Sequence, residues 1–220
     1  MEKGPSSSDF EVEVDSHDRH LQSKLRTIRA VDNARVATTA LALLMGLTVM
    51  GVSANTLAVY YDTHVPADFL VSLWPDAFNL RPTVALVIGS VIVAVSNIVA
   101  LCFSKVRVLR NKTTTHTALT FAAPLVGLAA ALIAIIFFYT VNASDSVDTF
   151  LSWTCRWTAV SMSQSPHWGT LCKQSQAGLY LSIVLIPVEA VALGLAAYVV
   201  KAERYTNAYN SARKGSPALS

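Results

Sequence analysis

A single acid interrupts a long apolar segment near the C-terminus. Glu189 is the only charged residue between Gln174 and Val200. At about 1.5 Å of helical rise per residue it lies ~16 Å from Gly178, close to the midplane of a bilayer that the segment would cross. An ionised carboxylate is costly there, so we expect the acid to be protonated or paired. A buried acid of this kind serves either a proton relay or cation site, or hydrogen bonding between helices.

Few polar groups in the other apolar segments are able to reach this acid. Asn97 and Ser53 are the candidates from other segments, and Ser182 shares the face of Glu189 in its own segment. We expect this face to point into the protein rather than toward lipid. No Lys or Arg lies within an apolar run, so an ion pair is not expected. A lone acid without a second titratable group favours the hydrogen-bonding role over transport.

The sequence lacks the motifs of known catalytic and metal centres. His17 and His20 have the spacing of a metal-binding pair, but the other three histidines are scattered along the chain. There is no nucleophile elbow, phosphate-binding loop, dinucleotide fingerprint or pair of catalytic carboxylates. We therefore expect neither an enzyme, nor a cofactor, nor a metal site.

The composition indicates that the surrounding solvent is lipid. Hydrophobic residues make up 53% of the 220 residues and charged residues 14%, whereas soluble domains average about 25% charged. Charge-poor runs long enough to cross a hydrocarbon core predict transmembrane helices near 37–60, 83–103, 117–140 and 177–200. We expect an all-α membrane protein, a four-transmembrane-helix bundle over residues 37–200. Small residues at close-packing spacing support tight helix contacts: Ala85 and Gly89, Ala123, Gly127 and Ala131, and Ala190, Gly194 and Ala197.

The distribution of basic residues predicts the orientation. Fourteen of the 17 Lys and Arg residues lie in the N-terminal segment, the second loop and the C-terminal tail, and three lie in the first and third loops. Basic segments resist translocation, so both termini and the second loop are expected in the cytoplasm. The first and third loops are then extracellular.

The third loop, about 141–176, carries Cys155 and Cys172 on the side of the membrane where thiols oxidise. The third cysteine of the chain, Cys102, is expected at the opposite face, so pairing of the other two is nearly forced. We predict a structural disulfide that closes this third loop, which is the second of the two extracellular loops, and stabilises it by roughly 3 kcal/mol. Tryptophans in the two extracellular loops are expected to form either a recognition surface or an interfacial anchor: Trp74, Trp153, Trp157 and Trp168.

Three further segments are expected in the cytoplasm. Residues 1–16 are polar and acidic and predict a disordered tail, and residues 201–220 form a second tail. Residues 17–36 predict a basic amphipathic juxtamembrane helix. The helix would either lie on an anionic leaflet or carry basic residues that only set the orientation of the chain in the membrane. The short second loop forms a basic patch that faces the inner leaflet: Lys105, Arg107, Arg110 and Lys112.

With these features the chain resembles the fungal four-span membrane proteins grouped as MARVEL-like. The resemblance covers about residues 35–200 and lies in the segments 73–82, 153–157 and 169–172, in the short basic middle loop and in the cytoplasmic termini. It implies a role in membrane apposition, trafficking or lateral domains. Claudins differ because they place their paired cysteines in the first extracellular loop, and tetraspanins differ because they carry a Cys-Cys-Gly motif that is missing here.

We therefore expect a non-enzymatic membrane organiser or accessory subunit that packs laterally with other membrane proteins. The alternative is a small channel or proton-coupled transporter that uses Glu189. The expected partners are membrane lipids, with an anionic inner leaflet, and other membrane proteins or further copies of the chain, but not nucleic acid. The plasma membrane is the expected location, with an endomembrane as the alternative.

Overall fold

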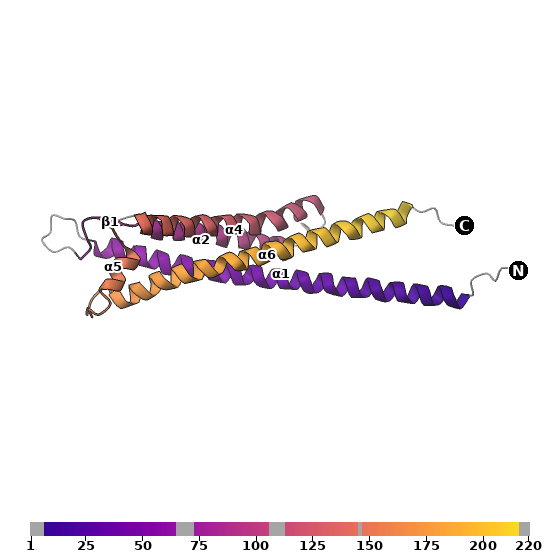
Figure 1. Cartoon of the computed structure of the whole chain (residues 1–220), viewed down its shortest axis with the longest axis horizontal. Coiled ribbons are helices and arrows are strands. Elements are labelled where there is room, and N and C mark those ends of the chain that lie inside the picture. The colour runs from indigo at the N-terminus through magenta and orange to yellow at the C-terminus, as the bar shows by residue number, and fades with distance from the viewer. Residues whose placement is uncertain (1–6, 65–72, 106–112, 145–146, 216–220) are drawn as a thin grey trace. The chain divides into compact units, whose positions relative to one another are not determined.

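The computed structural model describes residues 7–64, 73–105, 113–144 and 147–215, and these are mostly helical (Figure 1). In chain order the elements are α1 (Ser7–Thr63), β1 (Phe78–Asn79), α2 (Arg81–Lys105), α4 (Thr113–Ser144), β2 (Asp148–Thr149), α5 (Phe150–Arg156) and α6 (Trp168–Gly215). Within the described residues, four helical segments are long and apolar enough to cross a membrane: Arg26–Thr63, Arg81–Ser104, Thr120–Ala143 and Trp168–Ala202. Four spans were predicted, and their number and approximate positions are confirmed.

The chain divides into two compact units, and the smaller one contains the first part of α1 and the last part of α6, up to Ala37 and from Gly194. In α1, Arg35 donates to the carboxylate of Asp32 one turn earlier, at 2.8 and 3.2 Å. The expected juxtamembrane helix 17–36 is helical throughout. Of its side chains that the structure describes, Arg26 and Arg29 are exposed, and Ile28 is half-buried.

Both long helices extend further than the sequence indicated. Helix α1 begins at Ser7, where a disordered tail was expected through residue 16, and α6 continues through the expected tail to Gly215. Acidic residues are concentrated near the start of α1, where the positive end of the helix dipole interacts favourably with their negative charge. In α6 no proline follows Pro187 until Pro217, so the apolar helix has no local signal to stop at the membrane boundary.

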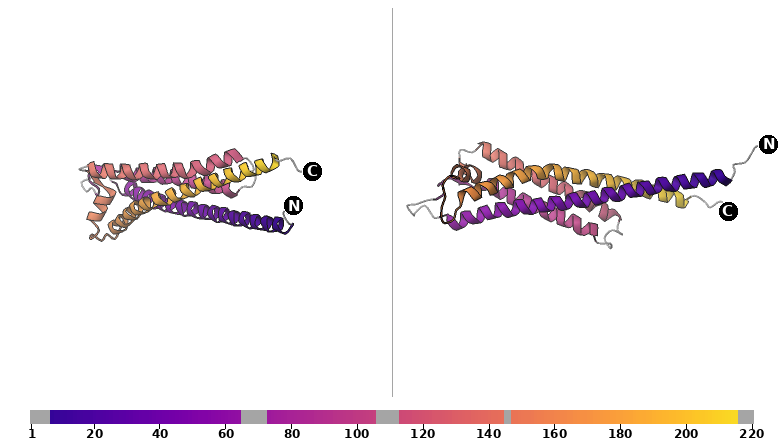
Figure 2. Two further views of the ribbon diagram at one scale, coloured as in Figure 1. Left: turned by 45° about the vertical axis from the view of Figure 1, so that its right-hand side comes forward. Right: turned by 90° about the horizontal axis from the view of Figure 1, so that it is seen from below.

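The larger unit, Thr38–Leu193, contains most of the four apolar helical segments. Helices α2 and α4 lie side by side (Figure 1, Figure 2). A Cβ on Gly89 of α2 would lie only 2.6 Å from Cβ of Ala134 and 3.3 Å from the carbonyl oxygen of Ala130. The predicted close packing through small residues therefore occurs here, because only glycine lets the two backbones approach this far.

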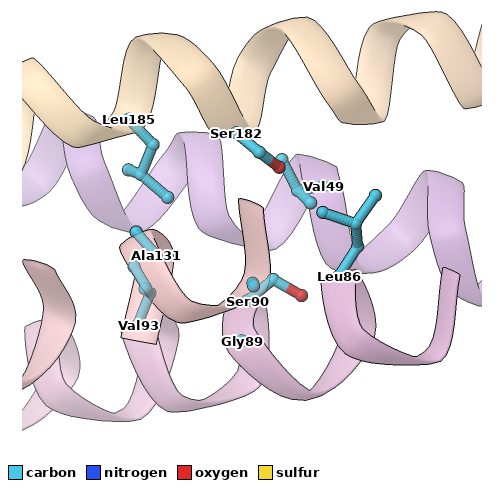
Figure 3. Close-up of a pocket in the computed structure, with 9 residues that line it drawn as sticks. Val49, Leu86, Gly89, Ser90, Val93, Ala131, Ser182 and Leu185 are labelled. Atoms are coloured by element: carbon cyan, nitrogen blue, oxygen red, sulfur yellow. The ribbon is translucent and has the colours of Figure 1, made fainter. Parts of the chain in front are cut away.

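Two apolar clusters fill the interior of the larger unit, each with side chains from all four long helices. Val49, Leu86, Ala134, Ile135, Phe138 and Leu179 form one, and Ala42, Val93, Ala130, Ala131 and Leu185 form the other. Between them lies a cavity of about 10 Å³, with Ser90 and Ser182 among the residues that line it (Figure 3). This volume is at the lower limit for one water molecule. Large apolar side chains elsewhere on the helices face outward, as lipid contact requires, such as Leu44 and Val184.

A small folded cap lies at one end of the four long helices. We call it the lid, and it consists of residues 73–80 and 147–172. Strands β1 and β2 pair in parallel, with Phe78 opposite Asp148 and Asn79 opposite Thr149. Thr149 then caps α5, because its side chain accepts from the backbone of Ser152 while the Ser152 hydroxyl accepts from the backbone of Thr149. The chain thus turns from a two-residue strand directly into a helix within the lid.

Candidate functional site

Glu189 is fully buried on α6 and is bonded to α2. Its Oε1 accepts a hydrogen bond of 2.6 Å from Nδ2 of Asn97, and the same Nδ2 also donates to the carbonyl oxygen of Val93 at 3.0 Å. Glu189 is 0% exposed and Asn97 is 2% exposed. The predicted contact between Glu189 and Asn97 is therefore present.

Helix α4 supplies the third wall of this site through a glycine. A Cβ at Gly127 would lie 2.9 Å from Oε1 of Glu189 and 3.0 Å from Oε2. The carboxyl group therefore packs directly against the backbone of α4, in space that any other residue would fill. The spacing of small residues in this helix predicted close packing, but it contained no signal that the packed group would be the acid.

Of the two serines expected near the acid, Ser182 is buried on α6 like Glu189, whereas Ser53 lies elsewhere. A Cβ on Gly178 would be 3.3 Å from Oγ of Ser53, which places this serine toward the lid end of α6, eleven residues before Glu189. Ser182 donates its hydroxyl to the carbonyl oxygen of Gly178 in its own helix, at 2.7 Å. The prediction that Ser53 is a neighbour of the acid is wrong, because Ser53 lies about three helical turns away and the sequence alone does not fix the register between helices.

The surroundings of Glu189 limit its chemistry. Among the described residues, Oε2 has no hydrogen-bond partner, and no charged group forms an ion pair with the carboxyl. An ionised carboxylate enclosed with a single hydrogen bond would be very costly, so the neutral acid is the form that this site tolerates. The group joins α2, α4 and α6 at one point, and its buried second oxygen is able to carry the proton of the neutral acid.

The lid carries an aromatic cluster centred on Trp74. Trp74 is 2% exposed, and its ring lies 5.0 to 5.6 Å from the rings of four neighbours, which are Tyr60, Phe78, Phe150 and Trp168. Its indole Nε1 donates to Oγ1 of Thr63 at 3.0 Å. The expectation that Trp74 and Trp168 form a recognition or interfacial surface is therefore corrected, since Trp168 is only 5% exposed. These rings form the core of the lid together with the end of α1, because residues 73–80 fold back over that end.

The exposed surface of the lid is built on α5 and the segment that follows. The predicted Cys155–Cys172 disulfide is present, with 4.8 Å between the Cα atoms. Arg156 donates to both carboxylate oxygens of Asp148 at 3.0 and 3.2 Å, and its guanidinium lies 5.8 Å from the ring centre of Trp153. Trp157 is 40% exposed beside Trp153 and is the tryptophan that remains available to a partner.

Some predicted residues fall where the structure gives no account of them. Of the inner-leaflet basic patch, Arg107, Arg110 and Lys112 lie outside the described residues, and Lys105 is the last residue of α2. Within the described part of the chain, no three His, Cys, Asp or Glu side chains lie close enough together to hold a metal ion.

Comparison of the chain with protein family models, with curated proteins and with solved structures found no match.

Proposed function

We propose that the protein is a non-enzymatic membrane organiser or accessory subunit, with four helices packed as a bundle and the lid facing the extracellular side. The observation that carries this proposal is the construction of the lid. Strand pairing, a capped helix, a disulfide and a buried aromatic cluster all stabilise a segment of about 30 residues outside the apolar spans. Such extensive stabilisation fits a surface that must keep one shape for a partner.

The exposed part of this surface has the composition of a contact site. Trp157 and Val160 are 40% and 45% exposed and lie next to Arg156, whose side chain is 58% exposed. Aromatic residues and arginine are enriched where proteins bind one another, and a surface held by a disulfide loses little entropy on binding. We therefore assign partner contact to the segment 156–160, and lateral packing to the apolar faces of the helices.

The buried acid supports the same proposal. A carboxyl enclosed by α2 and α4 positions three helices relative to one another, and no second titratable group among the described residues forms a relay with it. The resemblance to MARVEL-like proteins agrees with a role in lateral organisation of the plasma membrane. The proposed orientation, with cytoplasmic termini and an anionic inner leaflet beside the basic second loop, follows from the distribution of Lys and Arg.

The experiment compares protein partners recovered with the wild type and with Trp157→Ser. Both are extracted gently from their own membrane, and the recovered proteins are quantified by mass spectrometry. The matched control is Tyr205→Ser, which removes a 69% exposed aromatic residue from α6 beyond its apolar segment Trp168–Ala202. We expect a defined set of partners that decreases with Trp157→Ser and is retained with Tyr205→Ser. Equal recovery with all three proteins would contradict the assignment of the lid.

A small channel or proton-coupled transporter is the second candidate, and the observation that favours it is the unpartnered Oε2 of Glu189. The test is proton flux into proteoliposomes driven by a pH gradient. Glu189→Gln preserves the shape of the side chain and its bond to Asn97 but removes the titratable group. If the wild type gives a proton flux above that of empty liposomes and Glu189→Gln abolishes it, the transporter role would replace the organiser proposal.

A further inference from the structure

An apolar groove runs along the outward face of α2 and α4. Its volume is about 520 Å³, within the range of ~300–1,000 Å³ typical of small-molecule sites. The floor consists of small residues from both helices, which are Ala85, Gly89, Ala130 and Ala134. The walls are large and exposed, such as Ile133 at 67% and Ile88 at 56%. The groove therefore exists because the close approach of the two helices at Gly89 leaves a hollow between taller side chains.

The length and position of the groove match one leaflet. On α2 its lining extends from Arg81 to Ile92, eleven residues apart and hence ~16 Å by helical rise. Half of a hydrocarbon core of ~30 Å is about the same length. The groove thus begins at the lid end of the span and ends near the middle of the membrane.

One end of the groove is polar and positively charged. Arg81 is the only charged residue in the lining, and it lies there with Tyr61, which is 67% exposed. Among the described residues no acid forms an ion pair with Arg81, and its side chain is exposed. A guanidinium binds phosphate oxygens through two parallel hydrogen bonds, and a phenol hydroxyl at the same level supplies a further donor. The charge at this end fits a phosphate, and the remainder fits a hydrocarbon chain.

We propose that the groove binds one glycerophospholipid of the outer leaflet, with its phosphate on Arg81 and one acyl chain between α2 and α4. A sterol offers no anionic group to the guanidinium. A second copy would have to bring an acid such as its own Asp62 to that level, and the test below separates this outcome from lipid binding. This site goes beyond the proposed organiser role. Lipid binding requires only that α2 and α4 span a membrane, and its assignment to the outer leaflet rests on the proposed orientation.

The test measures binding of phosphatidylglycerol to the full-length protein after lipid has been removed in detergent. Native mass spectrometry follows the first bound lipid as its concentration is raised. Arg81→Gln removes the phosphate contact at an exposed position, and Ala85→Phe fills the groove. The matched controls are Lys173→Gln, an exposed cation at the lid end of α6, and Ala129→Phe, an exposed site of α4 outside the groove.

We expect both groove variants to weaken the first binding event by about tenfold or more, and both controls to stay within about twofold of the wild type. Arg81→Lys should lie in between, because it keeps the charge but not the paired donors. Circular dichroism checks folding, and Arg81→Gln alone decides the matter if Ala85→Phe fails to fold. Unchanged binding in Arg81→Gln would overturn the proposal. The proposal would also be overturned if a sterol bound equally well to the wild type and to Arg81→Gln. A dimer of the wild type that Ala85→Phe dissociates, with no loss of bound lipid, would overturn it as well.

Discussion

Substitution of Gly127 by alanine tests the role of the buried acid. The new methyl carbon would lie 2.9 Å from Oε1 of Glu189 and 3.0 Å from its Cδ, where ordinary contact begins at 3.4 Å. The carboxyl must therefore move, and its 2.6 Å hydrogen bond from Asn97 must weaken. The same exchange at Gly51, where an added Cβ meets nothing within 4 Å, serves as the matched control.

The expected cost of Gly127→Ala follows from three contributions. Overpacking of a filled interior costs about 1–3 kcal/mol, and loss of a hydrogen bond between membrane helices costs about 0.6–1.7 kcal/mol. Alanine favours a helix by up to about 1 kcal/mol relative to glycine. We therefore expect Gly127→Ala to lower the free energy of unfolding by about 1–5 kcal/mol, whereas Gly51→Ala should leave it unchanged or raise it slightly.

The measurement is reversible unfolding in mixed micelles as the fraction of sodium dodecyl sulfate is raised. A double-mutant cycle with Glu189→Ala isolates the contact, because the methyl group has room once the acid is removed. In the Glu189→Ala background, Gly127→Ala should change the free energy of unfolding by less than about 0.5 kcal/mol, as expected for a residue that no longer has an interacting partner. An equal cost with and without Glu189 would refute the proposed packing of the acid against α4.

Three further substitutions test other parts of the structure. Asn97→Leu should destabilise by about 1–3 kcal/mol in the same unfolding assay, because it leaves the acid Glu189 without a hydrogen bond; no change would contradict the importance of that bond. Cys155→Ser should remove roughly 3 kcal/mol of loop stabilisation and speed amide hydrogen exchange in the lid but not in the helices, and unchanged exchange would contradict it. Trp74→Phe should lower the melting temperature followed by near-ultraviolet circular dichroism, whereas the exposed Trp157→Phe should not, so equal effects would argue against a lid centred on Trp74.

The helical spans were predictable because their signal is local. Hydrocarbon thickness sets a minimum length for an apolar run, and charge is excluded from it, so counting residues located all four segments. The disulfide was predictable for a similar reason, since two cysteines shared one loop. Helix ends were less predictable, because α1 and α6 continue past the apolar boundary without a stop signal.

The contacts between side chains of neighbouring helices were less predictable, because the sequence does not show which residues of two helices lie at the same depth. Asn97 was correctly predicted to meet Glu189, since few polar groups existed to choose from. Ser53 was wrongly placed, because a shift of about three helical turns between two helices leaves the same apolar pattern. Trp74 was misassigned because an aromatic loop beside a membrane has the same composition whether its rings face lipid or one another. The fold of the lid decides between these possibilities.

The most direct test of the organiser proposal is native mass spectrometry of the protein gently extracted from its own membrane. The proposal predicts a reproducible complex, either with another membrane protein or as a homo-oligomer of fixed size. The mass should also show the closed disulfide between Cys155 and Cys172. A monomer that retains no other protein chain would contradict the proposal, and proton flux through Glu189 would then become the leading function.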